Sequence, residues 1–190
     1  TLNTATGNQM VLRGVENLTL TKTAEGANKI NSADSAVAVT AKVDGKAVNI
    51  DGLTAGSTFT TVKDVATALT GTNLTVKFAS AEAASTLTLG AGASGAITTD
   101  KITNVTINAA EALSNTGSAF TFTTATSVTI NGTKDVKGTV AAADNKLENL
   151  TITSSEEINM GNTTNVAELK KVTATATKAA TKAIFINFFI

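Results

Sequence analysis

A short phrase recurs along this chain at a nearly constant interval. A polar pair is followed by an apolar residue, a threonine and a second apolar residue, as in ENLTL, TNVTI, TSVTI and ENLTI. In the second half the central apolar residue is Val105, Val128, Leu150 or Val172, in steps of 23, 22 and 22 residues. Self-similarity at such a period is the mark of a stacked repeat architecture, in which each unit packs against its neighbours.

Each repeat unit has the pattern of a β-strand. Apolar residues and threonines alternate over five or six positions, and Asn, Gly, Ser or Asp residues bound each copy. Further strands are expected between the copies, at 119–124 and 157–160. Stacked coils would place equivalent residues about 4.8 Å apart, with apolar ladders inside and threonine ladders outside. We therefore predict an all-β fold, a β-solenoid or irregular stacked β-repeat structure with coils of about 22 residues.

The regularity of the repeat divides the chain into three regions. Residues 1–99 carry looser copies, 100–177 carry regular copies, and 178–190 form an apolar tail that ends in FINFFI. A single continuous domain is expected. The tail is interpreted as a terminal strand, an export signal or a truncated end, and we expect the chain to be a fragment of a longer protein.

Two local signals predict departures from simple coils. In 37–50, VAVTAKV and KAVNI flank Asp44-Gly45, and such a dipeptide between strand patterns predicts a hairpin with a type I′ turn. In 61–69, Val62, Val65 and Leu69 share one helical face, which predicts one short helix at most.

Composition excludes several classes of function. The chain has no Cys and no His, so catalytic triads and thiol dyads cannot form, and we predict no enzymatic activity. The net charge is zero, without the basic surface that nucleic acids require. No apolar run approaches the roughly 20 residues of a transmembrane helix.

Calcium is the cofactor considered, because carboxylates are hard oxygen ligands that suit it. The sequence contains neither an EF-hand loop nor the calcium-binding nonapeptide. Aspartates in predicted loops or turns have two interpretations: they are turn formers, or they form a sparse calcium site together with loop carbonyls. These weak metal candidates are Asp34, Asp44, Asp51, Asp100, Asp135 and Asp144.

The phrases VENLTLT, ITNVTINA, TSVTING and LENLTITSS, set in Thr/Ala/Gly/Asn-rich sequence without Cys, carry a resemblance. The chain resembles bacterial surface-layer (S-layer) proteins and the repeat regions of type I-secreted, RTX-like surface proteins, without the RTX nonapeptides. The resemblance implies a secreted, extracellular, often calcium-dependent β-rich module that self-assembles into a lattice around the cell. It carries over no ligand residue, because the nonapeptides are missing.

The expected function is therefore structural. The chain would form a stiff module of a bacterial cell-surface layer by self-association, with cell-surface polysaccharide as a partner through parts not present. One alternative is the stalk or passenger segment of a secreted adhesin or autotransporter. A second is the outer domain of a flagellin-like filament protein.

Overall fold

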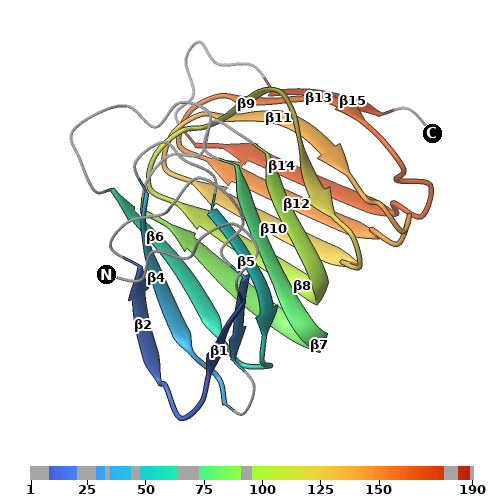
Figure 1. The fold of residues 1–190 in the computed structure, drawn as a ribbon. Coiled ribbons are helices and arrows are strands. Elements are labelled where there is room, and N and C mark those ends of the chain that lie inside the picture. Colours follow the sequence, from blue (N-terminus) through green and yellow to red (C-terminus); the bar gives the residue numbers. More distant parts are fainter. Residues whose placement is uncertain are drawn as a thin grey trace.

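The chain folds into a β-solenoid built from parallel strands (Figure 1). The computed structural model describes residues 9–20, 29–32, 35–43, 48–63, 73–90, 96–177 and 184–188. Within these residues there is no helix, and every strand pair is parallel. The strands are β1 (Gln9–Leu12), β2 (Asn17–Leu20), β3 (Lys29–Ser32), β4 (Ala38–Val43), β5 (Val48–Leu53), β6 (Thr58–Lys63), β7 (Leu74–Leu89), β8 (Ile97–Ala109), β9 (Leu113–Phe122), β10 (Ser127–Gly132), β11 (Val136–Ala141), β12 (Asn149–Ser154), β13 (Ile158–Thr163), β14 (Lys171–Ala176) and β15 (Ile184–Phe188).

Successive strands alternate between two stacks. One stack, called here the Thr-rich sheet, contains β2, β4, β6, the C-terminal parts of β7 and β8, β10, β12 and β14. The opposing sheet contains β5, the N-terminal parts of β7 and β8, β9, β11, β13 and β15. The parallel pair β1 and β3 lies beside β5. Each coil thus adds one strand to each stack.

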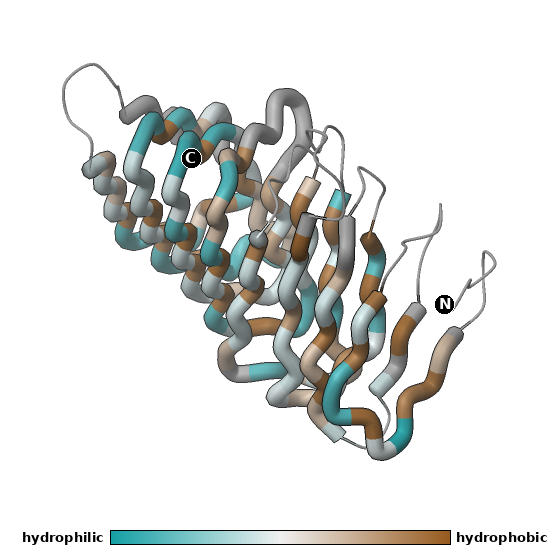
Figure 2. Tube along the Cα trace, turned by 90° about the vertical axis from the view of Figure 1, so that its left-hand side faces the viewer, coloured by the Kyte–Doolittle hydropathy of each residue, from teal (hydrophilic) through white to brown (hydrophobic). Residues whose placement is uncertain are grey.

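The predicted repeat register is confirmed. Val128 pairs with Val105 on one side and with Leu150 on the other, and Leu150 pairs with Val172. Inward and outward positions alternate along these strands. In β12, for example, partly buried and fully buried residues follow one another. Figure 2 shows the same alternation as hydrophobic and hydrophilic residues following one another along the tube.

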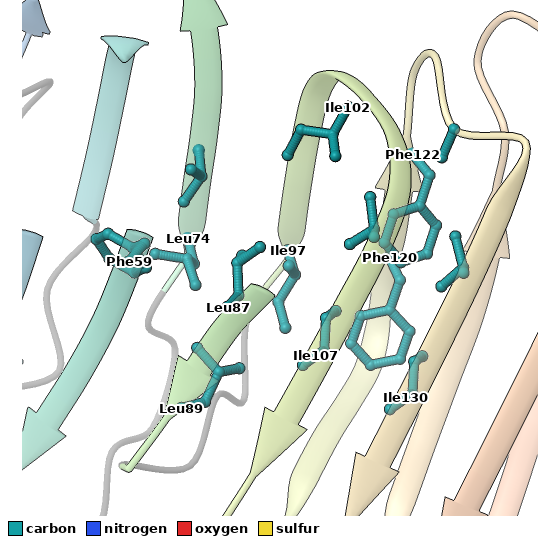
Figure 3. Close-up of a cluster of buried hydrophobic side chains, with 14 of the residues drawn as sticks. Phe59, Leu74, Leu87, Leu89, Ile97, Ile102, Ile107, Phe120, Phe122 and Ile130 are labelled. Atoms are coloured by element: carbon teal, nitrogen blue, oxygen red, sulfur yellow. The ribbon is translucent and has the colours of Figure 1, made fainter. Parts of the chain in front are cut away.

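The core lies between the two sheets and consists of stacked apolar side chains. In Figure 3, Ile97 and Ile107 stand on the two limbs of β8, which arches over at Ile102, and all three are essentially inaccessible to solvent. Phe120 of β9 lies beside Ile97 in the next coil of the same sheet and is buried to the same degree. Burying a large apolar side chain contributes about 1.5–3 kcal/mol, so the repeated inward positions supply most of the driving force.

Backbone hydrogen bonds between coils continue through the corners of the solenoid. The N–H of Thr126 donates to the carbonyl of Thr103 at 2.9 Å, and the N–H of Glu148 donates to the carbonyl of Thr126 at 2.9 Å. The N–H of Lys170 then donates to the carbonyl of Glu148 at 2.8 Å. At this corner the coils are therefore hydrogen-bonded to one another outside their strands as well.

The hairpin prediction is wrong. Strands form on both sides of Asp44-Gly45, but β4 pairs with β2 and β6, whereas β5 pairs with β7. The turn itself, within 44–47, lies outside the described residues. Both strands satisfy their backbone groups with neighbouring coils, and β4 and β5 contribute to opposite sheets. The local turn signal therefore predicted the strands but not their partners.

Three further expectations have structural outcomes. Residues 61–63 belong to β6, so the helix prediction is wrong there, and 64–69 lie outside the described residues. The strands predicted near 119–124 and 157–160 are present as β9 and β13. Part of the C-terminal tail forms β15, which pairs in parallel with β13, as the terminal-strand interpretation expects.

We predict that replacing Thr61 with Val stabilises the protein. Thr61 occupies an inward position between Ala41 and Leu89 of neighbouring coils, and its buried hydroxyl has no hydrogen-bond partner. An unsatisfied buried hydroxyl costs about 1–3 kcal/mol, so Thr61→Val should raise the free energy of unfolding by about 1 kcal/mol. Urea denaturation measures this.

The matched control is Thr60→Val, on the outward side of the same strand, which should change the free energy of unfolding by less than about 0.5 kcal/mol. A loss of stability in Thr61→Val would mean that the hydroxyl is hydrogen-bonded in solution.

Candidate functional surfaces

The candidate aspartates do not gather into one site. Asp135 and Asp144 lie in connections between strands, as predicted. Asp34 and Asp44 lie outside the described residues. Among the described residues, no three acidic side chains come close enough together to hold a metal ion.

Asp51 and Asp100 were predicted in loops or turns, and this is wrong. Asp51 lies in β5 and Asp100 in β8, and both are paired with Lys77 of β7, which stands between them. The positions are outward-facing and half-buried, where a charged side chain still reaches water. Opposite charges on adjacent strands attract, so this Asp–Lys–Asp row suits the outside of the opposing sheet. The alternation of buried and half-buried residues in VNIDGL could have predicted this position, because it places Asp51 on the face of the strand opposite to that of buried Ile50.

Asp135 instead bonds one coil to the next. One carboxylate oxygen accepts the backbone N–H of Glu157 at 3.0 Å, and the other lies 3.0 Å from the Lys137 ammonium. Lys137 also contacts the Glu157 carboxylate at 2.9 Å. The two carboxylates raise the pKa of Lys137, mainly through the hydrogen bond to Glu157 and then through that to Asp135.

Two exposed ion pairs link successive coils in the same way. Lys134 lies 2.6 Å from Glu111, and Lys170 lies 2.9 Å from Glu148. In each pair the hydrogen bond to the carboxylate raises the lysine pKa. These pairs lie on the surface, where screening by water leaves each with a small contribution to stability.

Neutral polar side chains make a further set of bonds between coils, which the sequence did not reveal. The side chain of Asn73 accepts the N–H of Ala96 at 2.9 Å, and that of Asn145 accepts the N–H of Ala167 at 2.7 Å. The partners are 23 and 22 residues apart, about one coil. No recurring residue signalled them, because the residue one coil on from each asparagine is an alanine, Ala96 or Ala167.

Glu156 and Glu157 are adjacent carboxylates in the connection between β12 and β13. The Glu157 carboxylate is engaged by Lys137, and the backbone N–H of Glu156 donates to the Ser154 hydroxyl at 2.9 Å. Glu157 therefore contributes to the contacts between coils, whereas the Glu156 bond is local to its own turn.

The outer surface of the Thr-rich sheet carries two parallel rows of short polar side chains. Strand pairing sets Thr88 beside Asn108, Asn108 beside Asn131, and Asn131 beside Thr153. The Asn131 side-chain amide donates to the Asn108 side-chain oxygen at 2.9 Å. We call both rows together the Thr/Asn face; its members are Thr86, Thr88, Thr106, Asn108, Thr129, Asn131, Thr151, Thr153, Thr173 and Thr175.

A hollow of about 320 Å³ opens at one edge of this face. Its floor comes from an inward row that shrinks from Leu89 to Ala109 to Gly132 in successive coils. A Cβ atom at Gly132 would lie 2.6 Å from a methyl carbon of Val136, so a larger residue cannot fill the space without displacing that side chain. The lining residues are Thr88, Leu89, Asn108, Ala109, Ala110, Asn131, Gly132 and Thr133.

Comparison of the chain with protein-family models, curated proteins and solved structures finds no match. Among the described residues, no helix is long and apolar enough to cross a membrane.

We predict that Lys137→Met destabilises the protein modestly. The variant leaves Asp135 and Glu157 without their shared cation, but the lysine side chain is 35% exposed, so the loss should be about 1 kcal/mol or less. The loss should shrink at high ionic strength because salt screens exposed charges. Urea denaturation at low and at high ionic strength measures both effects.

The same ion pairs predict a pH dependence. Because the folded state raises the pKa of Lys137, the stabilisation is present below the ordinary lysine pKa of 10.5 and is lost as pH rises through the raised value. Lys146→Met is the matched control, since Lys146 lies 3.8 Å from Asp144 and is 60% exposed. Equal losses in the two variants would contradict a specific role for the Lys137 pairs.

Proposed function

We propose that this chain is a structural module of a bacterial cell-surface layer, a stiff β-solenoid that self-associates within a lattice or coat. The observation that carries the proposal is the register of the ladders. Equivalent residues of successive coils lie directly above one another in both sheets and through the corners.

Stiffness follows from how the coils are joined. Each coil is attached to the next by backbone hydrogen bonds in both sheets, by bonds to side chains such as that from the Ala167 N–H to Asn145, and by ion pairs such as Lys170–Glu148. A solenoid of this kind is stabilised by nearest-neighbour interfaces. A rod with many equivalent contacts of this type suits a load-carrying spacer.

The chemistry of the surface is consistent with this proposal. Many of the described carboxylates at the corners are already engaged with lysines or backbone N–H groups of adjacent coils. The chain has no His or Cys with which to build a triad or a thiol dyad. The proposal is accordingly a non-enzymatic one.

In this proposal the chain is secreted and lies at the outer surface of the cell, and calcium supports assembly. Since the described residues of one copy gather no group of three acidic side chains, a lattice calcium ion would take ligands from more than one copy or from the remaining residues. Cell-surface polysaccharide would be bound by other parts of the assembly.

A stalk of a secreted adhesin is the competing proposal, because a stiff rod would serve there equally well. The two differ in lateral contacts: a surface layer requires copies to associate side by side, whereas a stalk works as a separate rod. The flagellin-like alternative has no feature among the described residues that favours it.

We predict that the purified chain forms ordered sheets in millimolar calcium and that a chelator disperses them. Negative-stain electron microscopy measures this, with magnesium in place of calcium as the control for non-specific effects of divalent cations. Isolated short rods under all three conditions would contradict the lattice and favour the stalk.

A further inference from the structure

The Thr/Asn face is a two-dimensional grid of equivalent side chains. Strands β8, β10, β12 and β14 run side by side in Figure 1, and each contributes two outward residues of the grid. Parallel strands lie about 4.8 Å apart, and outward residues along a strand repeat every two residues, about 6.7 Å. Eight of the ten members are threonine and two are asparagine, so the grid carries no charge.

Threonine makes this grid rigid as well as regular. Its β-branched side chain is restricted at χ1, so each hydroxyl and methyl group has few positions available. The backbone beneath is fixed by ladders on both sides, as for Thr129 between Thr106 and Thr151. The array is therefore ordered before any ligand arrives, which lowers the entropic cost of binding.

The nature of the groups indicates what the grid can hold. Each hydroxyl both donates and accepts a hydrogen bond, and each methyl group presents an apolar surface beside it. Protein interfaces rely instead on Trp, Tyr and Arg anchors, with Thr under-represented at hot spots. A partner with a matching two-dimensional period of donors and acceptors is favoured over an irregular protein surface.

The hollow at the edge of the face adjoins the grid and shares Thr88, Asn108 and Asn131 with it. Its volume of about 320 Å³ is well above the roughly 10–15 Å³ that one water needs, so it has room for several waters. Its floor is apolar, at Leu89 and Ala109, while Asn108, Asn131 and Thr133 supply polar groups at its wall. Waters in this space would adjoin those on the grid.

We propose that the Thr/Asn face binds ice. Oxygen atoms along the a axis of hexagonal ice repeat at a spacing close to that between adjacent strands, so the hydroxyls can take part in the surface layer of the crystal. The methyl groups hold rows of water between the two threonine rows. This activity does not depend on the proposed role in a surface layer, because a single copy carries the complete grid.

The test measures thermal hysteresis and crystal habit in a nanolitre osmometer. The wild-type chain should lower the freezing point below the melting point and produce faceted crystals. The double variant Thr129→Leu/Thr151→Leu, which places bulky side chains in the middle of the grid, should lose most of the hysteresis. Thr129→Val/Thr151→Val keeps the side-chain shape and the strand while removing two hydroxyls, and should lose part of it.

The matched control is Thr98→Leu/Thr121→Leu, on paired outward positions of the opposing sheet, which should retain wild-type hysteresis. Circular dichroism of each variant verifies that the strands persist. Absence of hysteresis and faceting in the wild type would overturn the proposal, as would equal losses in the grid and control variants. So would sedimentation showing a wild-type dimer that the leucine variant abolishes, since the face would then belong to a second copy.

Discussion

The backbone hydrogen bond between parallel coils in register is the interaction on which the rest of this structure depends. It joins β10 to β8 and to β12 in the strands, and Thr126 to Thr103 at the corners. Because each coil lies directly above the last, every side chain meets its own equivalents. Residues that pack well against copies of their own kind are therefore favoured. This preference accounts for the repeated phrase, in which branched apolar residues stack inside and threonines stack outside.

The same stacking determines the use of polar residues near the strand ends. A buried or half-buried corner leaves backbone N–H groups that need acceptors, and the next coil is the nearest source. Asn145 and Asp135 supply such acceptors to Ala167 and Glu157. Lysines beside them neutralise the carboxylates. Asp135, which in isolation resembles a turn former or a metal ligand, is thus used to join coils.

The regular part of the fold could be predicted from sequence because its information is periodic. The steps between Val105, Val128, Leu150 and Val172 specify both the strands and their partners. Single local signals were less informative. Asp44-Gly45 indicated a reversal of the chain, but the pairing of the strands on either side of it is decided by coils elsewhere in the sequence. Likewise the phrases LTV and LTL, which begin at Leu74 and Leu87, do not keep the 22-residue step because they belong to opposite sheets. Two features depend on which coils become neighbours: the charged row formed by Asp51 and Lys77, and the hollow at Gly132. A local sequence pattern does not specify which coils are neighbours, so neither feature could be predicted from it.

A repeat that builds a core also builds its outer surface. Stacking Ile107 on Ile130 inside necessarily stacks Thr106 on Thr129 outside, so the surface acquires the period of the core. A catalytic centre needs several different groups brought together once, and strict repetition works against that. Strict repetition instead favours binding to another periodic object, such as a second solenoid or a crystal. Each added coil then adds an equivalent contact at the same spacing. The functions most accessible to this chain are therefore those in which affinity grows with the number of coils.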